Sequence, residues 1–200
     1  FVYRFVLLFF LGLLGGIVWN DTQSEADRFV ELQGVCIFIV ASNLFISLGN
    51  ISSVLRHQKS CIDGYINNRH SIQLYALAQL CAQLPVTFAC SLMFTLPVHF
   101  MAGLPVSAYG YVLVATWCLM LTVDSAVLVV VDLAQEAVSA VTGSFVLELF
   151  WFMFSSALRP VSDTPPIVRW IPALVPSTYA LRGITHSCLD DLEVQFSSYK

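Results

Sequence analysis

Charged side chains are scarce in this sequence of 200 residues: 9 Lys and Arg and 13 Asp and Glu make up only 11% of the chain. Soluble globular domains carry about 25% charged residues, so this chain cannot cover a water-facing surface in the usual way. Its net charge of −4 also excludes nucleic acid as a default partner, because nothing here would neutralise phosphates. The scarcity of charge therefore predicts a protein whose solvent and first partner is membrane lipid.

Sequence signatures of several common chemistries are also missing. The chain has no phosphate-binding G-x-x-x-x-G-K-[ST], no G-x-G-x-x-G, no H-E-x-x-H and no G-x-S-x-G. Its 6 cysteines show neither a C-x-x-C pair nor a Cys/His ligand spacing, which excludes a predicted zinc site or disulfide scaffold. We therefore predict no catalytic residue, no metal site, no cofactor and no enzyme activity on this chain itself.

What the sequence does have is long apolar runs. Hydrophobic residues make up 58% of the chain, and the mean hydropathy is +0.78. A helix that crosses a bilayer needs roughly 20 mostly apolar residues. The sequence predicts an all-α integral membrane protein, in a single membrane domain over residues 1–200, with about five transmembrane helices. They are expected at residues 5–19, 35–55, 80–104, 107–131 and 137–158.

Two further segments are expected to lie along the membrane surfaces. Apolar residues recur at roughly helical spacing from Ser71 to Leu84, which predicts an amphipathic helix on the cytosolic face before the chain turns inward at Pro85. Residues 159–200 combine four prolines after position 164 with apolar side chains, which favours short helices on the outer face.

The charges between the apolar runs predict the orientation. Residues 20–31 are acidic, whereas residues 56–70 carry Arg56, Lys59 and Arg69 against Asp63. Short cytoplasmic loops are enriched in Lys and Arg, so we place residues 56–70 and the N-terminal end inside and residues 20–31 outside. Arg4, near the inner end of the first run, is expected to extend to the interface.

Polar and small residues inside the runs are candidates for special roles. Asp124 and Glu148 are intramembrane carboxylates, and a charge at the bilayer centre costs roughly 2.5–3.5 kcal/mol, so each needs a partner, a wet cavity or a proton. Each carboxylate either marks a substrate or proton path or joins two helices. The glycine-rich stretch at residues 12–16 predicts a close helix–helix contact.

The order of these segments resembles the membrane domain of G-type ABC transporters, of the ABC-2 type. Residues 64–80 (GYINNRHSIQLYALAQL), followed by Gln83, Leu84 and Pro85, resemble the family's segment between its second and third membrane helices. Four shorter stretches are similar in order and spacing, and the likeness extends from Phe5 to about Glu193. These stretches are residues 12–19, 100–104 (FMAGL), 155–158 (SSAL) and 170–181 (WIPALVPSTYAL).

The resemblance implies a transporter domain driven by ATP and magnesium, both bound by a separate nucleotide-binding domain of the parent protein, an ABC-type ATPase. The chain would be an incomplete membrane domain, since the family has a sixth span. A second membrane domain would meet it at a two-fold axis, and substrate would pass between the second and fifth helices by alternating access. The parent is expected in the plasma membrane. Apolar or amphipathic substrates such as lipids, sterols or xenobiotics are expected, because aromatic and Met side chains supply contact area without a fixed hydrogen-bond pattern.

The resemblance also assigns residues to these roles. The contact region for the nucleotide-binding domain would include Arg56, Lys59, Asp63 and Arg69, although Gly64 and His57 stand where the family usually has acidic residues. The substrate path would be lined by Asn43, Phe45, Ile46, Phe150, Met153 and Phe154. For any one of these six residues, ordinary packing or lipid contact is the alternative.

Two other classes of function remain open at this point. A secondary transporter would use Asp124 and Glu148 for ion coupling, and would need no nucleotide-binding domain. A structural membrane protein would transport nothing. A phosphate-binding loop in the same polypeptide would favour the ABC transporter over both alternatives.

Overall fold

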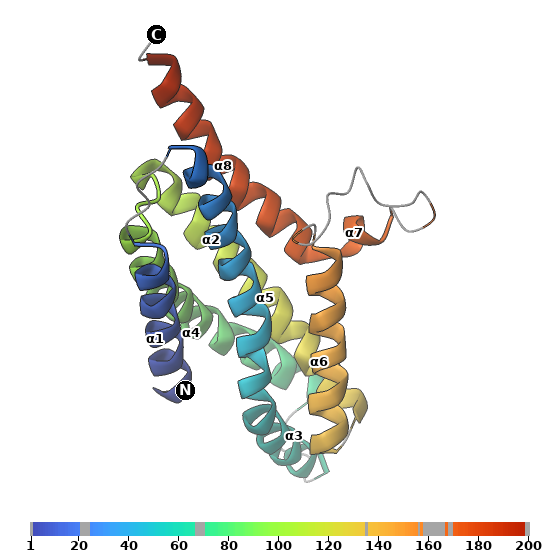
Figure 1. The fold of residues 1–200 in the computed structure, drawn as a ribbon. Helices are drawn as coiled ribbons and strands as arrows, with labels where there is room; N and C mark the ends of the chain where they lie inside the picture. Colours follow the sequence, from blue (N-terminus) through green and yellow to red (C-terminus); the bar gives the residue numbers. More distant parts are fainter. Residues whose placement is uncertain are drawn as a thin grey trace.

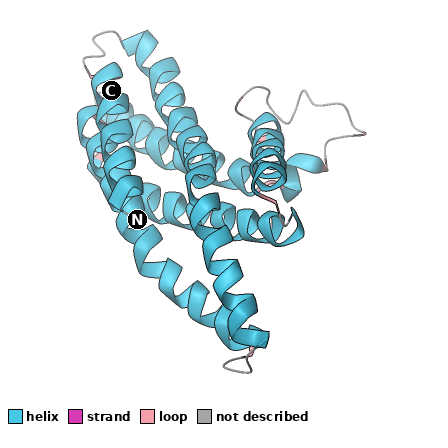
Figure 2. Ribbon diagram, turned by 90° about the horizontal axis from the view of Figure 1, so that it is seen from below, coloured by secondary structure: helices cyan, strands magenta, loops and turns pink. Residues whose placement is uncertain are grey.

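The computed structural model describes residues 2–20, 25–66, 71–134, 136–155, 157, 167 and 170–198. Over these residues the fold is built of helices and the turns between them, with no strand (Figure 2). The all-α prediction is confirmed. The helices are α1 (Val2–Val18), α2 (Glu25–Ile46), α3 (Ile51–Ile66), α4 (Ile72–Met101), α5 (Tyr109–Ala134), α6 (Ala137–Phe154), α7 (Ile171–Leu174) and α8 (Pro176–Ser198), with short 3-10 turns η1 (Ser47–Asn50) and η2 (Val106–Ala108).

Four segments of the described chain are both long and apolar enough to cross a membrane. They are Val30–Arg56, Leu77–Met101, Val106–Ala134 and Ala137–Phe154. The first predicted run corresponds to a shorter apolar helix, Tyr3–Val18. At about 1.5 Å per residue, that helix falls short of the roughly 30 Å hydrocarbon core, so it needs thinning or flanking side chains to span it. An integral membrane fold follows from these helices.

The second apolar run and the basic segment after it form one nearly continuous rod. Ile46 and Ile51, which flank η1, both have right-handed helical backbone angles, so the helical path continues from α2 through η1 into α3. In Figure 1 the start of α2 lies at one end of the molecule and α3 at the other. The acidic segment around Glu25 and the basic segment around Lys59 are therefore separated by the length of the bundle.

This separation gives the orientation a direct test. We expect a cysteine placed at Glu25 to react with an impermeant thiol reagent on intact cells, and a cysteine placed at Lys59 to react only after permeabilisation. Cys81 and Cys118 are exposed and would first be replaced by serine to remove background labelling. Labelling of position 59 on intact cells would invert the topology.

Helix α4 continues without interruption through two prolines, Pro85 and Pro97. The prediction that the chain turns inward at Pro85 is therefore wrong. A proline removes one helical hydrogen bond and commonly kinks a helix, but membrane helices tolerate it because neighbouring groups satisfy the freed backbone. Next to Pro85, the hydroxyl of Thr87 lies 2.8 Å from the carbonyl oxygen of Gln83 and 3.1 Å from that of Leu84.

Gly12 and Gly16 of α1 lie directly against α4, and the sequence predicts such a close helix–helix contact. A Cβ atom added to Gly12 would come within 2.6 Å of the carbonyl oxygen of Phe94 and 2.9 Å of the Cγ of Pro97. One added to Gly16 would come within 2.7 Å of the Cβ of Met101. Only glycine permits this backbone approach, and α1 and α4 share the most extensive helix contact in the described chain.

The buried apolar residues form two clusters that divide the bundle along its length. The larger cluster joins α1, α2, α4, α5 and α8, and it includes the fully buried Leu8, Ile39, Phe94, Val112 and Ile184. The smaller cluster joins α3, α5 and α6 around Ile51, Val127, Val131 and Ala140. Helix α5 contributes to both and is the central element of the fold.

The segment after α6 contains a long helix, contrary to the prediction of short helices alone. Residues 158–166 lie outside the described residues, α7 has 4 residues, and α8 has 23. Pro176 stands at the first position of α8, where a missing N–H costs nothing, and no proline follows it, so nothing breaks the helix. Ser177 and Thr178 donate to the carbonyls of Trp151 (3.0 Å) and Phe154 (3.1 Å), which joins α8 to the end of α6.

Candidate functional site

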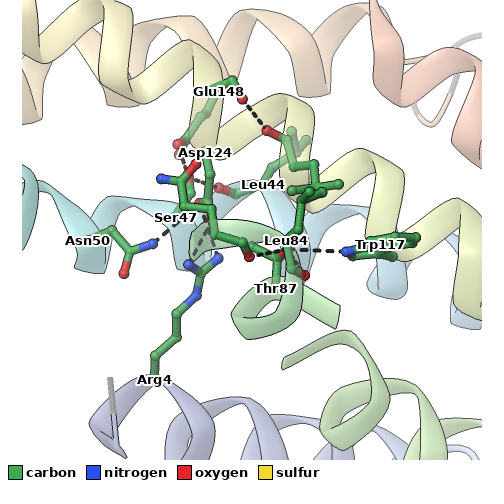
Figure 3. Close-up of polar contacts among 12 residues, drawn as sticks. Arg4, Leu44, Ser47, Asn50, Leu84, Thr87, Trp117, Asp124 and Glu148 are labelled. Atoms are coloured by element: carbon green, nitrogen blue, oxygen red, sulfur yellow. Dashed lines mark hydrogen bonds and ion pairs between the residues drawn. The ribbon is translucent and has the colours of Figure 1, made fainter. Parts of the chain in front are cut away.

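A buried ion pair joins the first turn of α1 to the middle of α5. Arg4 donates from Nη1 to Oδ2 of Asp124 at 2.8 Å and from Nη2 to Oδ1 at 3.1 Å. The two residues are only 8% and 4% exposed. Figure 3 shows the Arg4 side chain extending from its own helix toward Asp124. The prediction that Arg4 extends to the membrane interface is therefore wrong, because the guanidinium lies inside the bundle.

The geometry of this pair meets the requirements for charge inside a membrane domain. A bidentate guanidinium–carboxylate contact supplies two charge-assisted hydrogen bonds. Asn50, at the end of η1, adds a third and longer contact from Nδ2 to Oδ1 of Asp124 at 3.4 Å. Desolvation of two charges is expensive, so such a pair is stable only when both partners stay in place. Asp124 therefore fastens α1, α5 and η1 together.

A second carboxyl group lies nearby on α6. Glu148 is 1% exposed, and its Oε1 accepts a hydrogen bond from the hydroxyl of Ser47 in η1 (Figure 3). The Ser47 hydroxyl also lies 2.8 Å from the carbonyl oxygen of Leu44. Within the described chain, Oε2 of Glu148 and the hydroxyl of Ser144, one turn earlier on the same face of α6, have no hydrogen-bond partner. Glu148 thus ties α6 to η1.

The ion pair forms part of the wall of a cavity between α1, α3, α4 and α5. The cavity has a volume of about 330 Å³, within the range of small-molecule pockets. Thr87, which is buried, contributes to its α4 wall and also accepts a hydrogen bond from Nε1 of Trp117 at 3.1 Å. The lining residues are Arg4, Asn50, Ser53, Val54, Ala78, Gln79, Ala82, Gln83, Val86, Thr87 and Asp124.

The predicted path residues on α2 lie mostly inside the bundle. Asn43 is fully buried, and its Nδ2 donates to the carbonyl of Ile39 at 2.6 Å. Phe45 packs between the helices, with ring centroids 6.2 Å from Phe145 and 6.1 Å from Phe152 of α6. The structure therefore brings α2 and α6 together through Phe45. Ile46 is half-buried beside it.

The predicted path residues on α6 lie nearer the surface of the chain. Phe150 is 42% and Met153 54% exposed, and the ring of Phe150 lies 4.7 Å from that of the half-buried Phe154. These three side chains point away from the face of α6 that carries Glu148. Only 17% of the α6 span is buried within the chain, the smallest share among the candidate spans.

The predicted contact region for a nucleotide-binding domain lies on and after α3. Arg56 is exposed on this helix. The backbone of Lys59 and Asp63 also belongs to α3, but their side chains lie outside the described residues, as does the whole of Arg69. Gly64 lies within the helix near its end.

Sequence reasoning missed the partners of both carboxylates. The sequence predicts Arg4 as an interface anchor, and it assigns neither Ser47 nor Asn50 to a carboxylate. One signal was available for Arg4: its run holds a single cation, and the run containing Asp124 holds a single anion, so pairing would neutralise both. No comparable signal marks Ser47 and Asn50, because small polar residues are common in membrane helices.

The described helices and their buried polar contacts define a multi-pass membrane protein in which Arg4 and Asp124 pair inside the bundle. The chain belongs to the ABC-2 type transporter family, whose pattern it matches over residues 1–189. This result confirms the resemblance to ABC transporters drawn from the sequence.

Individual relatives place the chain beside the G family. It is 22% identical over 187 residues to the broad substrate specificity ATP-binding cassette transporter ABCG2 of Bos taurus, covering 92% of this chain and 28% of that protein. It is 22% identical over 193 residues to ABC transporter G family member 37 of Arabidopsis thaliana, with coverages of 94% and 13%. The ABC multidrug transporter atrA of Aspergillus oryzae is 24% identical over 175 residues, with coverages of 84% and 12%. The chain therefore spans less than a third of the length of each relative.

Proposed function

We propose that this chain is the transmembrane domain of an ATP-driven, G-type ABC transporter that moves apolar or amphipathic substrates by alternating access. The observation that carries the proposal is the family match over residues 1–189, together with relatives from the G family. Two relatives are named a broad substrate specificity transporter and a multidrug transporter, which supports a substrate range set by apolar contact rather than by one hydrogen-bond pattern.

In this proposal the energy comes from outside the chain. ATP and magnesium are bound by a nucleotide-binding domain, and Arg56, Lys59, Asp63 and Arg69 form its contact region on the membrane domain. The position of α3 at one end of the bundle supports this arrangement, because a soluble domain would reach it without entering the bilayer (Figure 1). Hydrolysis there would move α3 and, through the continuous rod, α2.

A second membrane domain completes the substrate path. Exposed apolar side chains of α6, including Phe150 and Met153, favour contact with another membrane domain, although lipid would satisfy them as well. Substrate would pass between the two copies of α6, next to α2, with Phe150, Met153 and Phe154 as lining residues and Phe45 and Ile46 behind them. Asn43 would position α2 rather than touch substrate, since it is fully buried. The plasma membrane is the proposed location.

The ion-coupling alternative has less support. Both oxygens of Asp124 accept hydrogen bonds from Arg4, and the guanidinium already neutralises the negative charge that a coupling cation would need. In this proposal, which rests on membership in the ABC-2 type family, ATP supplies the energy and no ion gradient is needed. We therefore assign Asp124 and Glu148 to helix pairing.

Transport by the full-length protein tests this proposal. We expect proteoliposomes to accumulate fluorescent amphipathic dyes when ATP is present, and not with a non-hydrolysable ATP analogue. The double variant Phe150→Ala, Met153→Ala should reduce the uptake rate by about thirtyfold, since each truncation removes roughly 1 kcal/mol of apolar contact. Phe10→Ala is the matched control, because Phe10 is 57% exposed on α1, far from α6 in the fold (Figure 1).

Other outcomes would contradict the proposal in distinct ways. Dye uptake driven by a proton or sodium gradient without ATP would favour the secondary-transporter hypothesis. Equal losses in the α6 double variant and the Phe10 variant would remove the α6 face from the substrate path.

A further inference from the structure

The cavity beside the ion pair is separate from the proposed substrate path. Its walls come from α1, η1, α3, α4 and α5, and none of the residues that line it belongs to α6. On α4 the lining residues recur every three or four positions from Ala78 to Thr87, so they form one face of that helix. Nothing in the proposed transport cycle uses this face.

The two charged side chains on the cavity wall already form an ion pair with each other. Arg4 and Asp124 form two hydrogen bonds, and separating them would leave a buried, uncompensated charge. An anionic headgroup would meet the Asp124 carboxylate, and a cationic one would meet the Arg4 guanidinium. The cavity therefore disfavours a ligand of either charge.

Most of the lining surface is apolar, and a few uncharged hydrogen-bonding side chains lie on it beside the ion pair. The remaining polar lining comes from the amides of Asn50, Gln79 and Gln83 and the hydroxyls of Ser53 and Thr87. Amides and hydroxyls both donate and accept hydrogen bonds, which matches a hydroxyl or amide group of a ligand.

The α4 side of the cavity leads to lipid. Ala78 and Ala82 line the cavity and are exposed on the surface of the chain, so their small side chains leave the cavity open to lipid. Leu74, one turn before Ala78 on the same side of α4, is 68% exposed, which is suited to an acyl chain. This stretch of α4 also begins at the end of the span Leu77–Met101, the level at which lipid headgroups meet the hydrocarbon.

We propose that this cavity binds the uncharged polar headgroup of an amphiphile, a hydroxyl-bearing or amide-bearing lipid, which enters from the bilayer past Ala78 and Ala82 while its chain lies along α4. The closed ion pair sets the preference for a neutral headgroup, and the amide and hydroxyl lining supplies its hydrogen bonds. This binding requires neither ATP nor a second membrane domain, so it stands or falls independently of the transport proposal.

Photolabelling of the full-length protein in nanodiscs tests this site. The probes share one long diazirine-bearing alkyl chain and differ only in the headgroup: an alcohol, a carboxylate or a trimethylammonium. We expect the alcohol to label peptides containing residues 50–54 and 78–87 about tenfold more than the charged probes. Ala82→Trp, which places a large ring at the cavity mouth, should reduce that labelling by about tenfold. Cys81→Trp is the matched control, since Cys81 is exposed on the same turn but does not line the cavity.

Several readouts keep the result decisive. Labelling around Phe9 and Phe10 on α1 reports non-specific contact with lipid and should not differ among variants. Ala78→Trp provides a second block if Ala82→Trp fails to elute as a folded species. In the unmodified protein, excess unlabelled alcohol should displace the probe and excess carboxylate should not. Equal labelling by all headgroups, equal displacement by both competitors, or full labelling of a folded Ala82→Trp or Ala78→Trp variant would overturn the proposal.

Discussion

Replacement of Arg4 by leucine is expected to lower the free energy of unfolding by about 3–5 kcal/mol. The physical reason is the carboxylate left behind: Asp124 is 4% exposed, and without the guanidinium its charge keeps only the 3.4 Å contact from Asn50. Whole domains are stable by only about 5–15 kcal/mol, so the variant should lose much of its folded yield. Asp124→Leu should lower the free energy of unfolding by a similar amount, since it leaves the Arg4 cation buried without its partner.

The double variant Arg4→Leu, Asp124→Leu distinguishes a pairing role from other roles. Removal of both partners leaves no buried charge, so most of the stability should return. Thermal unfolding in detergent, followed by size-exclusion, measures all three proteins. Arg182→Leu, at an exposed position of α8, is the control for loss of a cation and should leave the unfolding temperature unchanged. A double variant as unstable as the sum of the single variants would refute the pairing role.

The second large effect is expected at Gly12. Substitution with leucine should destabilise the protein by about 1–3 kcal/mol or more, because even the added Cβ would lie 2.6 Å from the carbonyl oxygen of Phe94. The clash involves backbone, so a side-chain rotation cannot relieve it. Helix α1 would have to move away from α4, and Arg4 on the same helix would move with it.

Gly110 offers a matched control for this substitution. It is exposed in α5, and an added Cβ there would meet nothing within 4 Å. Gly110→Leu should therefore leave stability unchanged or raise it slightly, since leucine is the better helix former. The measurement is the same thermal unfolding, with cross-linking between cysteines placed on α1 and α4 as a second readout. Equal unfolding temperatures for the two leucine variants would exclude a tight α1–α4 contact.

Much of the fold could be predicted from local properties of the sequence. Low charge and long apolar runs predicted a helical membrane protein, because an isolated segment in lipid must satisfy its own backbone hydrogen bonds. The Gly12 and Gly16 contact was also predictable, since glycine spacing within one helix suffices to favour close packing. The family resemblance followed from motifs such as the Leu84-Pro85 pair, whose order in the chain is a property of sequence alone.

Other local expectations were wrong where neighbours decide the outcome. Pro85 predicted a turn, but α4 runs through it as one helix. The prolines after residue 164 predicted short helices, but the last of them begins a helix of 23 residues. A proline breaks or starts a helix depending on the elements packed beside it, and a sequence pattern does not contain that information.

The sequence by itself determined the kind of protein: its solvent, its helical class, its apolar runs and its family motifs, all of which depend on residues close together in the chain. The tertiary structure alone decided the site. Arg4 and Asp124 are 120 positions apart, and the cavity beside them takes its walls from segments throughout the first two thirds of the chain. Which cation pairs with which carboxylate depends on the rotation of each helix and on its depth in the bundle, and both are set by packing in three dimensions. A buried charge is stable only where a partner from another helix reaches it.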